Sequence, residues 1–163
     1  MRRLMVMRHA KSSWADETIT DHERPLNERG RTAAAAMGRF MAERRLLPDR
    51  VLSSDSVRTR ETVSLWAEAA GWDGPVEFLP ELYHADVPTL LQAASALPDT
   101  CLRPLVVAHN PGIAELVSGS SGTMVEVPTG TLAVLEAALD RWAEISPSRL
   151  STMLTQRPRE LTA

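Results

Sequence analysis

Two histidines and two arginines in this sequence stand where predicted strands end. Arg8 and His9 follow a short apolar run at 4–7, and His109 follows a second apolar run. Arg58 lies in the first turn of a predicted helix that comes after a third run. Because ligands of open α/β sheets bind beyond the carboxyl ends of the strands, we expect these four side chains to share one site.

An anion is the ligand that such a site would bind, and phosphate is the anion that we expect. Arginine presents a planar, permanently charged fork that matches phosphate geometry. Histidine can donate, accept or attack through its ring nitrogens near neutral pH. The combination therefore predicts a phosphate or sulfate anion held among Arg8, His9, Arg58 and His109.

Predicted strands and helices alternate along the chain, and these elements must position the four side chains. Helix formers, capping residues and stop signals predict helices at 28–47, 56–71 and 86–97, and a further helix is expected after the turn at 110–112. Short apolar runs predict strands at 4–7, 51–54, 76–79, 104–108, 129–139 and 149–157. The run at 129–139 is also compatible with a helix. This order predicts an α/β three-layer sandwich, with a mostly parallel central sheet flanked by helices.

Several residues mark where the predicted helices begin and end. Asn27, Ser56 and Asp86 are expected N-caps, and Gly71 is an expected stop signal. The SGSSGT stretch at 118–123 has the composition of a flexible loop. It lacks the lysine and the strand-turn-helix context of a phosphate-binding P-loop.

Composition limits the classes of protein that this chain can represent. Its 163 residues suit a single domain over 1–163, and a net charge of −3 disfavours a nucleic-acid partner. The single cysteine, Cys101, excludes an internal disulfide and is consistent with a reducing, cytoplasmic location. No apolar stretch is long enough to span a membrane, so we expect no membrane partner.

Five motifs, in order along most of the chain, resemble those of the histidine phosphatases, also called the phosphoglycerate mutase-like superfamily. Among the members of this superfamily, the chain resembles the short SixA-type phosphohistidine phosphatases. One difference is Ala10, where the commoner family form has glycine after the Arg-His pair. The motifs that carry the resemblance are VMRHAKS, DHERPLNERGR, VLSSDSVRTRET, PELYHAD and LVVAHNP.

The resemblance implies a catalytic role for each residue of the predicted phosphate pocket. His9 would be the nucleophile, Arg8, Arg58 and His109 would complete the pocket, and Arg24 would also contact the anion. The chemistry is consistent, because a neutral imidazole can attack phosphorus and form a covalent intermediate. Phosphoryl transfer then depends on fixed positive charge, which the arginines and a protonated His109 would supply. No metal or other cofactor is expected.

The resemblance also implies that Glu81, in the PELYHAD motif, donates a proton to the leaving group. The alternative is that Glu81 is an ordinary solvated carboxylate in a turn. Its importance depends on the substrate, because an alkoxide leaving group needs a proton more than an imidazole does.

Further polar residues are candidates for the edge of the site. Lys11 and Asn110 are expected to bind substrate, and Ser12 and Ser13 could donate to the anion. Trp14 is either a rim for a protein substrate or a packed aromatic residue.

Two further histidines have less specific interpretations. His22 has the charged neighbours typical of a surface loop. His84 lies near Asp86, but the spacing matches no zinc motif.

We expect a metal-independent phosphatase that acts on protein phosphohistidine, because a chain of this length leaves little room for a lid over the site. One alternative substrate is a small phosphorylated metabolite. A non-catalytic phosphate-binding module is a second alternative. A mutase is less compatible, because it must protect a bisphosphorylated intermediate from water.

Overall fold

The central element of the computed structural model, which describes residues 1–161, is a six-stranded sheet with the order β3-β2-β4-β1-β5-β6. β1, β4, β2 and β3 pair in parallel, whereas β5 is antiparallel to both of its neighbours, β1 and β6. The strands are β1 (Arg2–Arg8), β2 (Arg50–Ser53), β3 (Val76–Phe78), β4 (Pro104–Ala108), β5 (Leu132–Ala137) and β6 (Leu150–Gln156). The sheet is mostly parallel, as predicted.

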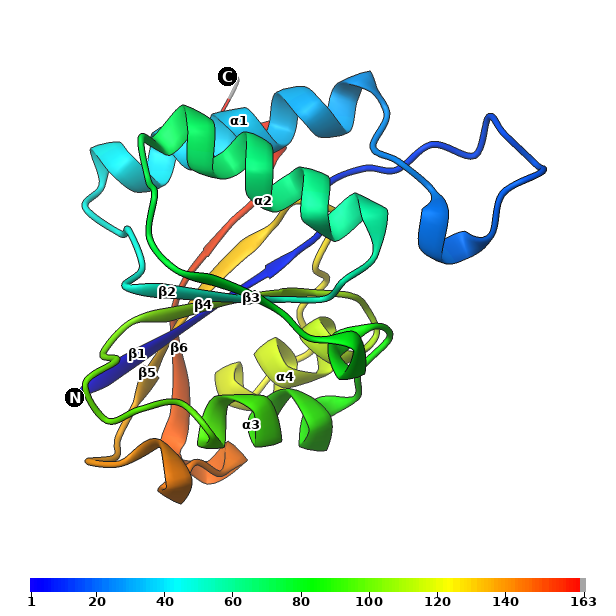
Figure 1. Ribbon diagram of the computed structural model, residues 1–163. Helices are drawn as coiled ribbons and strands as arrows, with labels where there is room; N and C mark the ends of the chain where they lie inside the picture. Colours follow the sequence, from blue (N-terminus) through cyan, green and yellow to red (C-terminus); the bar gives the residue numbers. More distant parts are fainter. Residues whose placement is uncertain (162–163) are drawn as a thin grey trace.

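Helices cover both faces of the sheet and make a three-layer structure (Figure 1). α1 and α2 lie on one face, and α3 and α4 lie on the other (Figure 1). The helices are α1 (Glu28–Glu43), α2 (Val57–Ala70), α3 (Val87–Ser95) and α4 (Gly112–Ser121). The prediction of an α/β three-layer sandwich is confirmed.

Because the sheet is buried on both faces, its strands have continuous apolar runs in the sequence. In β1, Met5 and Met7 join the core beneath α1 and α2, whereas Leu4 and Val6 join the core on the opposite face. Alternate side chains of a strand point to opposite faces, so a sheet covered on both sides needs apolar residues at every position.

Local signals at the helix ends behave as the sequence predicts. The side chains of Asn27, Ser56 and Asp86 each accept a hydrogen bond from a backbone N–H in the first turn of α1, α2 and α3. Gly71 ends α2 in the left-handed conformation. The segment at 129–139 contains strand β5, which decides between the two predictions made for it.

The prediction of a loop for residues 118–123 was wrong in part. α4 extends through the Ser and Gly residues to Ser121 and ends at Gly122, which has φ of +79°. The buried residues Ile113, Leu116 and Val117 anchor α4 against the core. Packing of this apolar stripe outweighs the weak helix propensity of serine and glycine.

The four parallel strands bring their carboxyl ends to one edge of the sheet, and two long-range contacts fix the loop that follows β1. Ser12 forms an isolated antiparallel bridge with Leu26, and Ser13 N–H donates to the Pro25 carbonyl. These contacts hold the two ends of the loop between Ser12 and Leu26 together, next to the carboxyl edge of the sheet. Among the described residues, no helix is both long and apolar enough to cross a membrane.

Candidate active site

A cavity of about 500 Å³ opens at the carboxyl edge of the parallel strands. The register pairs Arg8 of β1 with Ala108 of β4, so His9 and His109 leave two adjacent parallel strands at equivalent positions. Seven of the eight predicted site residues line the cavity, namely Arg8, His9, Lys11, Arg24, Arg58, His109 and Asn110.

A hydrogen bond to the backbone of the next residue fixes the tautomer of His9. Its Nδ1 lies 2.7 Å from the Ala10 carbonyl oxygen, which can only accept, so Nδ1 carries the proton and Nε2 keeps its lone pair. Burial lowers the pKa of His9 to about 3; the Ala10 hydrogen bond opposes this shift and the nearby arginines reinforce it. The ring is therefore neutral near pH 7, with Nε2 available as a nucleophile.

Arg58 is the best-buried charge of the site, with 2% of its surface exposed. Its Nε lies 3.4 Å from His9 Nε2, and its Nη2 lies 3.5 Å from His109 Nδ1. Nη1 donates to the Asp21 carbonyl oxygen at 2.7 Å, and Nη2 donates to Asp21 Oδ2 at 3.0 Å. The guanidinium is thus fixed between the two histidines by one residue of the loop after β1.

Among residues 1–161, Asp21 is the single carboxylate that lines the cavity beside the cationic groups. It accepts hydrogen bonds from Arg58, from Arg24 Nε at 3.0 Å and from the Tyr83 hydroxyl. Partial burial would raise the pKa of the Asp21 carboxyl, but these hydrogen bonds outweigh burial and hold that pKa well below its usual range. Asp21 is therefore charged, and it holds both Arg58 and Arg24 in place.

His109 differs in charge from the sequence-based expectation. Burial lowers the pKa of His109 to about 2, and the nearby His9 and Arg58 act in the same direction. Because Arg58 can only donate to His109 Nδ1, the neutral ring donates from Nε2 to Ser54 Oγ at 2.8 Å. His109 is therefore neutral. The positive charge of the cavity comes from Arg8, Arg24, Arg58 and Lys11.

Arg8 and Asn110 enter the cavity beside the segment that carries Val127. Arg8 Nη1 donates to the Val127 carbonyl at 3.2 Å, and its buried Nε has no hydrogen-bond partner in the described part of the chain. Asn110 uses its amide on the backbone, because Nδ2 donates to the Val127 carbonyl and Oδ1 accepts from Ala114 N–H. Asn110 therefore fixes the start of α4 against this segment, whereas the exposed Lys11 side chain faces the cavity.

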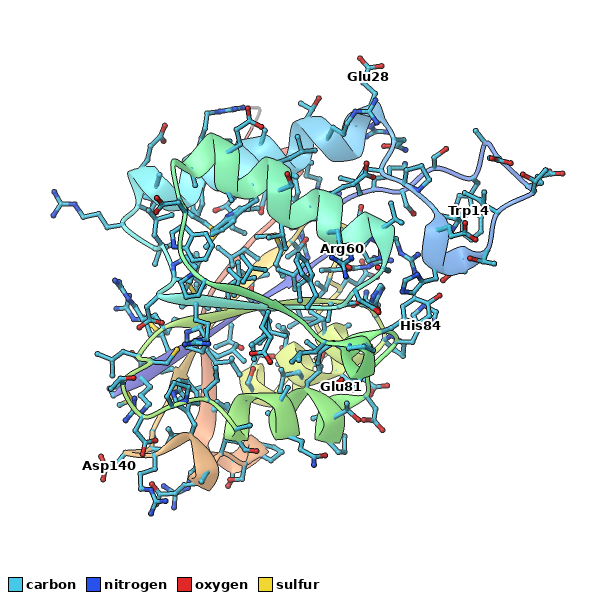
Figure 2. All side chains as sticks on the ribbon, viewed as in Figure 1. Trp14, Glu28, Arg60, Glu81, His84 and Asp140 are labelled. Atoms are coloured by element: carbon cyan, nitrogen blue, oxygen red, sulfur yellow. The ribbon has the colours of Figure 1, made fainter. Side chains whose placement is uncertain are left out.

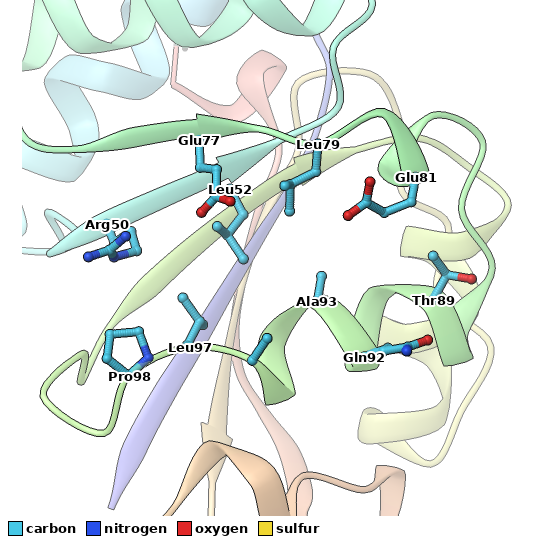
Figure 3. Close-up of a pocket in the computed structure, with 11 residues that line it drawn as sticks. Arg50, Leu52, Glu77, Leu79, Glu81, Thr89, Gln92, Ala93, Leu97 and Pro98 are labelled. Atoms are coloured by element: carbon cyan, nitrogen blue, oxygen red, sulfur yellow. The ribbon is translucent and has the colours of Figure 1, made fainter.

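Glu81 is the predicted site residue that the structure does not bring to this cavity. It lies in the short turn Pro80–Leu82, which buries Leu82 and leaves the Glu81 side chain exposed. Glu81 instead lines a separate hollow of about 510 Å³, together with Arg50, Glu77 and residues of α3 (Figure 3). The turn geometry separates this carboxylate from His9 and the arginines that line the cavity.

The structure adds Asp21, Tyr83 and His84 to the environment of the site. His84 lines the cavity, and its ring stacks on Tyr83 with a centroid separation of 4.1 Å. Both residues belong to the PELYHAD motif, and Asp21 begins the DHERPL segment. Their positions within these two motifs are the sequence signal by which the three residues could have been predicted.

Trp14 and His22 occupy different positions on the loop after β1. Trp14 is 74% exposed, and its ring lies 3.5 Å from the Arg24 guanidinium carbon (Figure 2). His22 pairs with Asp55 at 2.9 Å, outside the residues that line the cavity. Trp14 is thus exposed beside the cavity and is not packed in the core, and its contact with a protein substrate stays a prediction. Within residues 1–161, no cluster of three or more His, Cys, Asp or Glu side chains could hold a metal ion.

A neutral histidine with a free nitrogen, surrounded by arginines at the carboxyl edge of an α/β sheet, defines a class of phosphoryl-transfer enzyme. The model of the histidine phosphatase superfamily (branch 1) matches residues 4–92, more than half of the chain. The chain belongs to this superfamily and is a phosphatase of the SixA type.

Similar proteins extend this match to nearly the whole chain. An uncharacterised chloroplast protein of Arabidopsis thaliana is 34% identical over 153 residues, which cover 88% of this chain and 70% of that protein. The structure of a candidate phosphohistidine phosphatase SixA from Nakamurella multipartitia is 32% identical, covers 96% of each chain and has a TM-score of 0.83. A protein histidine phosphatase SixA complexed with tungstate has the same TM-score, covers 98% of this chain and 99% of that chain, and is 21% identical; it shows the shared fold.

Proposed function

We propose that this protein is a metal-independent phosphatase that removes phosphate from protein phosphohistidine through a phospho-His9 intermediate. The observation that carries the proposal is the orientation of His9. Its Nδ1 is bound to the Ala10 carbonyl, so the unprotonated Nε2 faces a cavity with three arginines. The tungstate bound to the SixA structure of the same fold supports an oxyanion as the ligand of this pocket.

The reaction proceeds in two displacements at phosphorus. In the first, the lone pair of His9 Nε2 forms a bond to phosphorus, and the bond to the leaving group breaks with its electron pair. In the second, water attacks phosphorus and the electron pair of the N–P bond returns to His9. Arg8, Arg24 and Arg58 stabilise the charge on the equatorial oxygens in both transition states.

A protein substrate is favoured over a small metabolite by the rim of the cavity. Trp14 and Lys11 are both exposed beside the phosphate-binding groups. An exposed tryptophan and a cationic side chain suit contact with a folded surface around the phosphorylated residue. The SixA-type relatives support the same class of substrate.

The test compares hydrolysis of a phosphohistidine protein, a phosphoserine peptide and a set of sugar phosphates, each with a chelator present. We expect kcat/KM to be highest for the phosphohistidine protein. His9→Ala removes the attacking atom, so kcat should fall by about 10³-fold or more. His22→Asn, which changes a histidine outside the cavity, is the matched control and should retain wild-type activity.

Two other results would each identify a different function. A sugar phosphate preferred by orders of magnitude in kcat/KM would point to a small-metabolite phosphatase with the same nucleophile. Tight phosphate binding without turnover of any substrate would point to a phosphate-binding module.

A further inference from the structure

We propose that His84, supported by Asp21, is the general acid that protonates the leaving group in this site. The inference rests on the proposed phosphatase reaction and assigns a step for which the structure brings no glutamate to the cavity. Glu81 lines a different hollow (Figure 3), whereas His84 lines the cavity that holds His9.

The geometry places the His84 ring at the open side of the phosphate-binding groups. Its Nε2 lies 3.3 Å from Arg58 Nη2, and its ring centroid lies 5.1 Å from that of His109. The side chain is 53% exposed and projects on the same side of the molecule as Trp14 (Figure 2). A phosphate bound to Arg58 would carry its leaving group outward, past a ring in this position.

Asp21 supplies the partner that an acid–base histidine requires. Its Oδ2 lies 3.4 Å from His84 Nε2 and also accepts the Tyr83 hydroxyl hydrogen bond. The ionised Asp21 carboxylate is the hydrogen-bond acceptor that faces His84 Nε2, and Arg58 Nη2 approaches the same nitrogen at 3.3 Å. Tyr83 stacks against the ring and fixes its plane.

The backbone of His84 is held in an uncommon conformation that sets the direction of the side chain. Its φ is +54°, in the left-handed region that few residues other than glycine adopt. The next residue, Ala85, is buried, and its carbonyl oxygen would lie only 2.0 Å from a Cβ placed on Gly112. Tight packing against the start of α4 therefore maintains this conformation.

The two chemical steps balance with His84 as proton donor and acceptor. As His9 Nε2 bonds to phosphorus, the leaving atom takes the electron pair of its bond and a proton from the His84 imidazolium. Neutral His84 then takes a proton from the attacking water, whose oxygen bonds to phosphorus as the electron pair of the N–P bond returns to His9. The cycle ends with both histidines in their starting protonation states.

The test uses a series of phosphate monoesters whose leaving groups range from nitrophenol to simple alcohols. His84→Asn keeps a residue that tolerates positive φ but cannot donate a proton as an acid. We expect its kcat/KM to fall by about 10²-fold or more for alkyl esters, the order expected for a lost acid, and by far less for the nitrophenyl ester, whose leaving group needs little protonation. Inhibition by tungstate should be unchanged.

Two further variants distinguish general-acid catalysis by His84 from a structural role of this residue and from catalysis by Glu81. Asp21→Asn should steepen the same leaving-group dependence and also weaken tungstate inhibition, because it releases Arg58. An equal loss by His84→Asn for every ester, or a leaving-group-dependent loss in Glu81→Gln, would overturn the proposal. If the wild-type protein hydrolyses none of the esters and no phosphohistidine protein, the proposed function itself fails, and this inference fails with it.

Discussion

At the scale of single residues, the two buried histidines differ in which ring nitrogen carries the proton. His9 donates from Nδ1 to a backbone carbonyl and keeps Nε2 unprotonated, whereas His109 donates from Nε2 to Ser54 and turns Nδ1 toward Arg58. The hydrogen bond on one nitrogen determines the role of the other. His9 is thereby suited to attack, and His109 to hold the geometry around Arg58.

Substitution of Trp14 should affect a protein substrate and a small substrate differently. Its ring covers the Arg24 guanidinium and remains 74% exposed. Trp14→Ala should raise KM for a phosphohistidine protein by about fivefold, the order expected for loss of one exposed aromatic contact. KM for 4-nitrophenyl phosphate should change less than twofold.

The control for Trp14 is Leu102→Ala, which removes an exposed apolar side chain next to the opposite, amino end of β4. Leu102→Ala should leave both KM values unchanged. An equal rise in KM for both substrates in Trp14→Ala would show that the ring acts only by orienting Arg24.

Residue types and strand ends were sufficient to predict the centre of the site but not its periphery. The carboxyl-end rule brought His9, Arg58 and His109 together without any coordinates. Asp21 could not be selected, because its role depends on a loop whose path is set by the contact between Ser12 and Leu26. Glu81 matched a motif, yet the turn that buries Leu82 directs its carboxylate elsewhere.

At the scale of elements, the start of α4 must approach the loop after β3 closely. A Cβ at Gly112 would lie 2.0 Å from the Ala85 carbonyl oxygen, closer than any real contact. Gly112→Ala should therefore destabilise the fold by about 1 to 3 kcal/mol, as other overpacked sites do, and should lower kcat/KM because His84 adjoins the displaced backbone.

The same helix contains the matched control for Gly112. A Cβ at Gly119 would meet no atom within 4 Å, and alanine is a better helix former than glycine. Gly119→Ala should raise the free energy of unfolding by about 0.5 to 1 kcal/mol and leave activity unchanged. Urea denaturation and kinetics of both variants provide the measurements; equal effects would contradict the proposed close contact.

Elements were predicted well where local and tertiary preferences agree. The capping residues Ser56 and Asp86 mark true helix starts, since their hydrogen bonds are made within the first turn. The end of α4 was misjudged because its serines and glycines favour a loop locally, whereas burial of Leu116 and Val117 favours a helix.

At the scale of the whole molecule, the site makes stability depend on pH. The pKa of His9 is lowered to about 3 and that of His109 to about 2, so the unfolded chain binds protons near pH 6.5 that the folded chain does not. Stability should therefore fall as the pH decreases below about 6.5. Asp21 would add to this fall only at lower pH, near the ordinary pKa of an aspartate.

The measurement is the free energy of unfolding in urea at pH 7 and at pH 5. We expect a clear decrease at pH 5 for the wild type, at a rate of up to about 1.4 kcal/mol per pH unit for each proton taken up. His109→Gln should show a smaller decrease, since one of the two groups is removed. An identical decrease in that variant would contradict the assignment to His109.

The central place of β1 has a consequence for synthesis of the chain. β1 ends next to His9, the proposed nucleophile, and its partners are β4 at 104–108 and β5 at 132–137. A ribosome therefore makes His9 95 residues before β4 begins at 104 and 123 residues before β5 begins at 132. Pairing across such separations closes long loops, which slows folding. A nascent chain contains both partners of β1 only once Ala137 has been added, so hydrolysis should begin only after β5 has been translated.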